Sequence, residues 1–243
     1  MTYGKLQLTD AAVKPRRVRG IVKRSDQGWP LGTKGVQGGA KAGTWDHVQM
    51  TCRLITPADA AALAGLVRAN RDFLAPWEPL RDEGYFTEAG QLADIEQALE
   101  RHQTGNALPW VILDADGAVA GRITLNGIVR GAFQSCSVGY WLSSAAGGRG
   151  LATSALHDIK TTAFSELGLH RIQAETLPHN DASQRVLARN GFSRIGFAPT
   201  YLKIAGRWQD FVLYQIVNHD PAEREDGSNI GPALSATGTA PQP

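Results

Sequence analysis

The sequence is poor in cysteine: Cys52 and Cys136 are the only two among its 243 residues, and neither lies in a C-x-x-C or His-rich spacing. This scarcity excludes a disulfide framework and argues against a Cys/His metal site. Apolar, strand-like residues flank both cysteines, so we expect reduced thiols inside the core. We therefore expect no metal in this protein.

Long hydrophobic runs are also missing. No apolar segment approaches the roughly 18 to 20 residues that a membrane-spanning helix needs, and the first residues lack the apolar region of a signal peptide. The sequence contains no internal repeat. These features predict a cytoplasmic protein that does not insert into a membrane.

Charge is distributed unevenly along the chain. Residues 1–41 carry nine Lys or Arg and two Asp, whereas the remainder carries 16 basic and 21 acidic side chains. Segment 1–43 is also rich in glycine and lacks periodicity, so we expect a flexible arm. Its basic residues 14–24 have two open interpretations, a contact with a polyanion such as ribosomal RNA and a solvated extension. Residues 219–243 are predicted to be a disordered tail, which leaves one domain at 44–218.

Helical and strand periodicities alternate within this domain. The dipeptide Asp116–Gly117 lies between two apolar runs and predicts a tight hairpin turn with positive φ. Asn180 is the expected N-cap of the last helix, and Gly191 is its expected stop. The expected strands cover 47–55, the two arms of a hairpin at 109–131, 135–143, 171–176, about 192–198 and 208–217, and the expected helices cover 57–74, 88–102, a segment from Leu151 and the segment between Asn180 and Gly191.

Three glycines, Gly147, Gly148 and Gly150, precede a segment whose apolar residues recur at helical spacing from Leu151 onward. Glycine lets the backbone approach a ligand closely, and the bare amides and dipole of a helix start attract anions. The pattern predicts a site for the pyrophosphate of a nucleotide-derived cofactor. A glycine-rich turn before an ordinary helix is the alternative that spacing alone leaves open.

Read with its flanks, the loop resembles the acyl-CoA pyrophosphate loop of the GNAT superfamily of N-acetyltransferases, Q/R-x-x-G-x-G/A. Gly147, Gly150 and Ala152 carry the pattern, and Gly147 stands where Gln or Arg is usual. The runs NRDFLAPWEP, GLHRIQAETLPHNDASQRVLARNGF and YLKIAGRWQDFVLY resemble the RimJ/RimL branch, whose members acetylate the N-terminal α-amine of ribosomal proteins. The resemblance covers about 48–217 and implies the GNAT fold, a mixed α/β domain in which about four helices flank a largely antiparallel twisted sheet of about seven strands.

The resemblance also implies acetyl-CoA as co-substrate. In the GNAT fold the strand before the glycine loop is splayed from its neighbour, and its free backbone groups receive the pantetheine arm and the thioester oxygen. Backbone amides aimed at an oxyanion contribute roughly 3 to 4 kcal/mol, so no side chain is obligatory there. The implied cofactor-binding residues are Tyr140, Trp141, Leu142, Gly147, Gly148, Arg149, Gly150, Leu151, Ala152, Thr153, Asn180 and Ser183.

The acceptor and the proton transfers have several candidate residues. An α-amine has a pKa of roughly 7.7 to 8.0, so a weak base acting through water suffices near neutral pH. By resemblance Glu175 is the best single candidate for that base, with Glu78 and Asp210 as competing carboxylates that would equally suit acceptor binding. Leu187 occupies the position of a tyrosine that many GNAT enzymes use as general acid, which leaves Ser183 or solvent to protonate the thiolate. Trp77 and Trp208 are further candidates for acceptor binding.

Three functions stay open at this stage. The first is a RimJ-type acetyltransferase for the N-terminal α-amine of a protein or peptide, and a ribosomal protein is the partner that the branch implies. The second is an acetyltransferase for a small amine or a peptide natural product, because one scaffold changes acceptor through its loops. The third is a non-enzymatic CoA-binding or RNA-binding adaptor. The expected assembly is a monomer or a homodimer.

Overall fold

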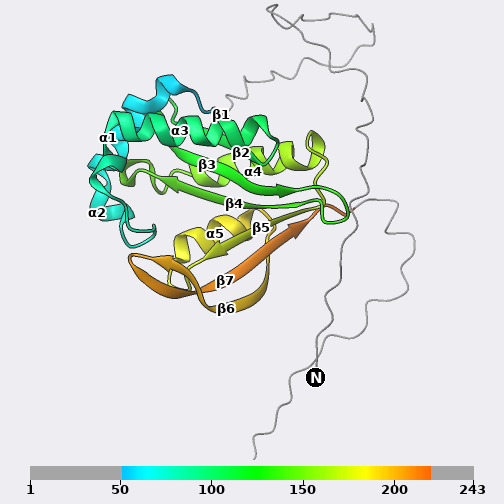
Figure 1. The fold of residues 1–243 in the computed structure, drawn as a ribbon. Helices are drawn as coiled ribbons and strands as arrows, with labels where there is room; N and C mark the ends of the chain where they lie inside the picture. Colours follow the sequence, from blue (N-terminus) through cyan, green and yellow to red (C-terminus); the bar gives the residue numbers. More distant parts are fainter. Residues whose placement is uncertain (1–50, 220–243) are drawn as a thin grey trace, which may run out of the picture. The chain divides into compact units, whose positions relative to one another are not determined.

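The computed structural model describes residues 51–219, in which seven strands form one sheet in the order β1-β2-β3-β4-β5-β7-β6 (Figure 1). All neighbouring strands are antiparallel except β4 and β5. The expected mixed α/β fold with a largely antiparallel sheet is confirmed. The strands are β1 (Cys52–Leu54), β2 (Ala107–Leu113), β3 (Val119–Val129), β4 (Ser135–Leu142), β5 (Arg171–Thr176), β6 (Ser193–Ile204) and β7 (Arg207–Val217), and the α-helices are α1 (Ala60–Ala69), α2 (Arg71–Leu74), α3 (Glu88–Gln103), α4 (Leu151–Ser165) and α5 (Asp181–Arg189).

The predicted arm 1–43 and all but the first residue of the predicted tail 219–243 lie outside the described residues. Within 51–219, no helix has the length and apolarity to cross a bilayer. Both cysteines are free and buried, as expected. Burial raises the pKa of each thiol to about 12, which keeps the sulfur protonated at neutral pH.

Helices cover both faces of the sheet, and the alternation along β2 shows why. Successive side chains of a strand point to opposite faces. Ile112 packs in the cluster that contains α4, whereas its neighbour Val111 packs in the cluster that contains α1 and α3. Because β2 is apolar on both faces, its sequence is a nearly continuous apolar run rather than an alternating one.

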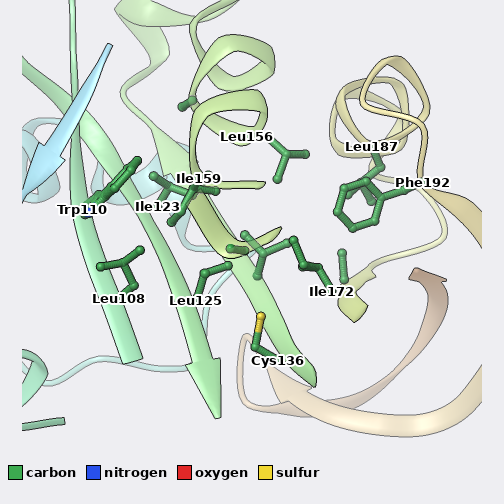
Figure 2. Close-up of a cluster of buried hydrophobic side chains, with 14 of the residues drawn as sticks. Leu108, Trp110, Ile123, Leu125, Cys136, Leu156, Ile159, Ile172, Leu187 and Phe192 are labelled. Atoms are coloured by element: carbon green, nitrogen blue, oxygen red, sulfur yellow. The ribbon is translucent and has the colours of Figure 1, made fainter. Parts of the chain in front are cut away.

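The larger core cluster joins the sheet to α4 and α5. Figure 2 shows Leu108, Ile123 and Leu125 from the strands facing Leu156 and Ile159 of α4, with Leu187 and Phe192 at one end. These seven side chains are almost inaccessible to solvent, and their packing fixes the position of α4 on the sheet. The first turn of α4, and the glycine loop before it, are thereby held at the end of β4.

The prediction of one continuous helix over 57–74 is wrong. A 3₁₀ turn at Pro57–Asp59 leads into α1, which ends before Asn70, and α2 follows as a separate short helix. The Asn70 side chain donates to the Leu66 carbonyl and accepts from the backbone N–H and hydroxyl of Ser144. These side-chain bonds compete with the regular helix and break it at this residue.

Two smaller expectations about turns also needed correction. At the β2–β3 connection only Gly117 has positive φ, because the Asp114 carboxylate accepts from the backbone N–H groups of Asp116 and Ala118 and holds a longer loop. Strand β6 extends to Ile204 rather than ending near residue 198. Ala205 and Gly206, both with positive φ, form its tight turn into β7.

Candidate active site

The site begins where β4 and β5 separate. The two strands pair only between Ser135–Ser137 and Arg171–Gln173, so the rest of each strand lacks the other as a hydrogen-bonding partner. A cavity of about 290 Å³ occupies this opening. We call it the gap cavity, and its lining includes Gly139, Tyr140, Glu175, Asn180 and Ser183.

A second cavity of about 430 Å³ adjoins the first. We call it the loop cavity, because Trp77, Glu78 and Tyr85 from the segment between α2 and α3 line it. The two cavities share Trp77, Asn126, Gly139 and Tyr140 as lining residues. A molecule in one cavity can therefore reach a molecule in the other beside the exposed backbone of β4.

The glycine loop lies between β4 and α4. Gly148 and Gly150 have φ of +75° and +82°, and a Cβ added to either would meet no atom within 4 Å. Gly150 is the N-cap of α4 and offers no side chain to its first N–H groups, which also have no partner within the helix. The guanidinium of Arg149 donates back to the Ala145 carbonyl. Open space in front of unpaired N–H groups is what an anionic ligand requires.

The start of α5 closes the other side of the gap cavity. The Asn180 side chain caps the helix by accepting from the Ser183 backbone N–H at 3.0 Å. The Ser183 hydroxyl lies 3.0 Å from the hydroxyl of Tyr140 on β4. Leu187, in contrast, is 1% exposed and belongs to the core, so that position faces away from the cavity.

Comparison with known proteins identifies the family. The acetyltransferase (GNAT) domain family matches residues 49–193. The chain belongs to this acetyltransferase family. It is 36% identical to the ribosomal protein uS5-alanine N-acetyltransferase of Escherichia coli over 173 residues, which cover 71% of this chain and 89% of that protein.

Two solved structures extend the comparison. A ribosomal-protein-S5-alanine acetyltransferase from Vibrio fischeri superposes with a TM-score of 0.67 at 36% identity, covering 70% of this chain and 93% of that one. RimJ of Mycobacterium smegmatis, solved in complex with CoA-disulfide, gives a TM-score of 0.66 at 31% identity and covers 73% of this chain and 83% of that one. The recognised resemblance to the GNAT superfamily and its RimJ/RimL branch is thus confirmed.

Two carboxylates of this acetyltransferase face the cavities. Glu175 lines the gap cavity and Glu78 the loop cavity. Burial raises the pKa of both carboxyl groups above the ordinary value. The Glu78 side chain is 17% exposed, and its nearest cationic atom, Nε of Arg81, is 3.9 Å away. Such a distance leaves the Glu78 carboxylate able to accept a further cation or hydrogen-bond donor.

The structure separates Asp210 and Trp208 from these groups. The Asp210 carboxylate accepts from the Thr200 backbone N–H at 2.8 Å, and Thr200 has a positive φ of 47°. Trp208 is 63% exposed. Both residues line a different hollow, beside Pro178 and His179, and neither lines the gap cavity or the loop cavity. Asp210 thus has a clear structural task in the irregular part of β6.

The remaining candidate residues lie at the end of β4 and in the first turn of α4. Trp141 lines the loop cavity, whereas Leu142 packs against the core. In the first turn of α4, Leu151, Ala152 and Thr153 are all partly buried, and the Thr153 carbonyl accepts from the Asn190 amide. All three follow the glycine loop directly in the chain.

Sequence reasoning missed part of the cavity lining. Asn126 faces both cavities, and an ion pair between Arg122 and Asp94 lines the loop cavity. The available signal was the Asn126–Gly127 dipeptide between the apolar residues Leu125 and Ile128, where β3 changes register against β4. Arg122 and Asp94 lie 28 residues apart, and no local pattern links them.

Proposed function

We propose that this acetyltransferase moves the acetyl group of acetyl-CoA to the N-terminal α-amine of a protein or peptide, with a ribosomal protein as the first acceptor to test. The observation that carries the proposal is the pair of adjoining cavities that meet at Gly139 and Tyr140. One cavity suits a thioester arm, and the other leads an acceptor to it from the side. The uS5-alanine acetyltransferases at 36% identity support the choice of an α-amine.

The residues present fit acetyl-CoA. The gap between β4 and β5 offers unpaired backbone groups to an amide-rich pantetheine arm, and the open glycine loop offers N–H groups to a pyrophosphate. The co-substrate supplies an acetyl group activated as a thioester. Backbone N–H groups beside Gly139 and Tyr140 would stabilise the negative charge that develops on the thioester oxygen.

The acceptor amine would enter through the loop cavity. Glu78 is suited to hold the α-ammonium group, because its partly buried carboxylate has only a distant cationic partner. Glu175 is suited to take the proton, directly or through water, because it faces the cavity that would hold the thioester. Once neutral, the amine forms the N–C bond, the C–S bond breaks, and the electron pair of that bond leaves with the sulfur. The nitrogen then loses a second proton to become an amide, which balances the proton that the departing sulfur takes up.

Ser183 is suited to assist the departing sulfur. Its hydroxyl lies at the N-terminal end of α5 and lines the gap cavity. The position of the usual tyrosine is filled by the buried Leu187, which does not line the gap cavity, whereas Ser183 does. The helix dipole also favours negative charge at this end.

The experiment that tests the function measures free-thiol release from acetyl-CoA. The panel contains peptides with Ala, Ser, Gly or Met N-termini, the same peptides with blocked N-termini, small polyamines and aminoglycosides. We expect turnover only with peptides whose N-terminal amine is free. Mass spectrometry should locate one acetyl group on that α-amine. Turnover confined to small amines would refute the proposal and favour the alternative acceptor class.

The basic segment 14–24 lies outside the described residues, and its proposed contact with a polyanion is tested separately. We expect a variant lacking residues 1–41 to acetylate short peptides at the full rate. Its affinity for ribosomal RNA should fall, with a weaker dependence on salt than the full chain shows. A large loss with a tripeptide acceptor would instead make the arm part of the catalytic domain.

A further inference from the structure

Tyr140 and Ser183 bring two hydroxyl groups together in the gap cavity. They come from different elements, β4 and α5, and their oxygens are 3.0 Å apart. The Tyr140 hydroxyl also has the Ser183 backbone carbonyl within reach as an acceptor, at the longer distance of 3.3 Å. The Tyr140 side chain packs against the larger core cluster, and Tyr140 lines both cavities. The hydroxyl is therefore placed by the core rather than by a mobile loop.

The distance allows either hydroxyl to donate, and the chemistry of the two groups favours one direction. A phenol O–H is a stronger donor than an alkyl O–H, and the oxygen of an alkyl hydroxyl is the better acceptor. Burial raises the pKa of Tyr140 to about 12, so the phenol keeps its proton throughout the neutral range. These properties favour Tyr140 as the donor to the Ser183 hydroxyl oxygen, which leaves the Ser183 proton free to point elsewhere.

We propose that Tyr140 is a positioning residue that donates to the Ser183 oxygen and thereby turns the Ser183 O–H toward the departing CoA sulfur. This inference rests on the proposed function, because it assigns Ser183 to the sulfur of CoA. Coupled hydroxyl groups polarise one another, so the Tyr140 bond also makes Ser183 a stronger donor. The pair replaces the tyrosine that the buried Leu187 cannot supply.

The first test requires no acceptor. The thiol pKa of CoA bound to the protein is read from the ultraviolet absorbance of the thiolate across a pH series. A hydrogen bond from Ser183 to the sulfur stabilises the thiolate more than the thiol and so lowers the thiol pKa. We therefore expect Tyr140→Phe and Ser183→Ala, which weaken or remove this bond, each to raise the pKa by roughly one unit. A Tyr140→Phe protein with the wild-type thiol pKa would overturn the proposal.

The matched control is Tyr214→Phe. The Tyr214 hydroxyl bonds the Gln184 side chain at 3.0 Å, on the same turn of α5, but Tyr214 lines neither cavity. The substitution removes the same kind of bond next to Ser183 without touching it. We expect an unchanged CoA thiol pKa and unchanged kcat. An equal effect of Tyr214→Phe and Tyr140→Phe would reduce Tyr140 to a structural support of α5.

The second test is a double-mutant cycle in the acetylation assay. We expect Tyr140→Phe to lower kcat about tenfold with KM for acetyl-CoA changed less than twofold, and the double variant with Ser183→Ala to be no worse than Ser183→Ala alone. Independent, multiplying effects would contradict action through Ser183. Site-specific 3-fluorotyrosine at position 140 keeps the fold and the hydroxyl, and its more acidic phenol should lower the thiol pKa further. A shift in thiol pKa without acetylation of any peptide would refute the acceptor while leaving the Tyr140–Ser183 pair in place.

Discussion

The two cavities differ in how much the main chain and the side chains contribute to their walls. The gap cavity opens because the backbone of β4 separates from that of β5, and side chains such as Glu175 and Ser183 complete its lining. The loop cavity is formed by charged and aromatic side chains from the segment after α2, from α3 and from β3. Backbone geometry is the same for every acceptor, whereas side chains can change one at a time. The donor half is therefore constrained mainly by main-chain conformation, and the acceptor half mainly by individual residues.

The largest effect should follow from filling the glycine loop. A valine at Gly150 places a branched side chain at positive φ in the space in front of α4, and we expect about a 100-fold loss of CoA affinity by calorimetry, equivalent to two lost charge-assisted bonds. Gly168→Val is the matched control, because Gly168 also has positive φ and open space but lies beyond the C-terminal end of α4. Both variants should lose a similar roughly 1 to 2 kcal/mol of stability from backbone strain. Equal CoA affinity in the two would show that the loop is an ordinary turn.

The next effect concerns Glu175 and separates activity from stability. We expect Glu175→Gln to lower kcat roughly 100-fold, the lower range for loss of a general base. Because burial raises the folded-state pKa of this carboxyl, its contribution to stability is full below the unfolded pKa and is lost as pH rises through the folded value. Glutamine avoids that loss, so thermal melts should show a more stable variant at pH 7 and no difference at low pH. Full activity would transfer the role of base to Glu78 or water.

A smaller effect should distinguish the acceptor side. We expect Glu78→Gln to raise KM for the peptide about tenfold and to leave the affinity for CoA unchanged, because a charge-assisted bond to the ammonium is lost. Glu83→Gln is the control: Glu83 lies on the same segment, but its side chain is 80% exposed and pairs with Arg71. Steady-state kinetics with both substrates varied would measure the split. A defect confined to acetyl-CoA would place Glu78 on the donor side.

The smallest effect should come from Asp210. Asparagine at this position keeps an oxygen that can accept from the Thr200 N–H, so we expect less than a twofold change in kcat/KM and a loss of about 0.5 to 1 kcal/mol of stability. Kinetics and urea unfolding would check both values. A drop in turnover comparable to that of Glu175→Gln would mean that Asp210 takes part in the reaction. It would then contradict the assignment of the reaction to residues of the two cavities.

Local sequence signals were sufficient where a single segment decides the structure. The glycines before Leu151 and the N-cap at Asn180 were both correctly placed, because caps and turns depend on a few neighbouring residues. The long apolar strand 135–142 was equally clear. The break at Asn70 was not, because its partner Ser144 lies 74 residues away. The apolar periodicity of Leu63, Leu66 and Val67 by itself predicts a continuous helix there.

The sequence by itself determined the order of strands and helices through local periodicity, and the glycine loop through its three glycines. Its motifs also carried the resemblance that identified the family and implied the backbone groups of the site. Only the tertiary structure decided which carboxylates face a cavity and which hydroxyls meet. Asp210 and Glu175 look alike along the chain, yet one holds a β6 backbone amide and the other lines the gap cavity. Tyr140 and Ser183 are 43 residues apart and come into contact because the core fixes β4 and α5 across the gap. Long-range packing sets those distances, and no local pattern encodes them.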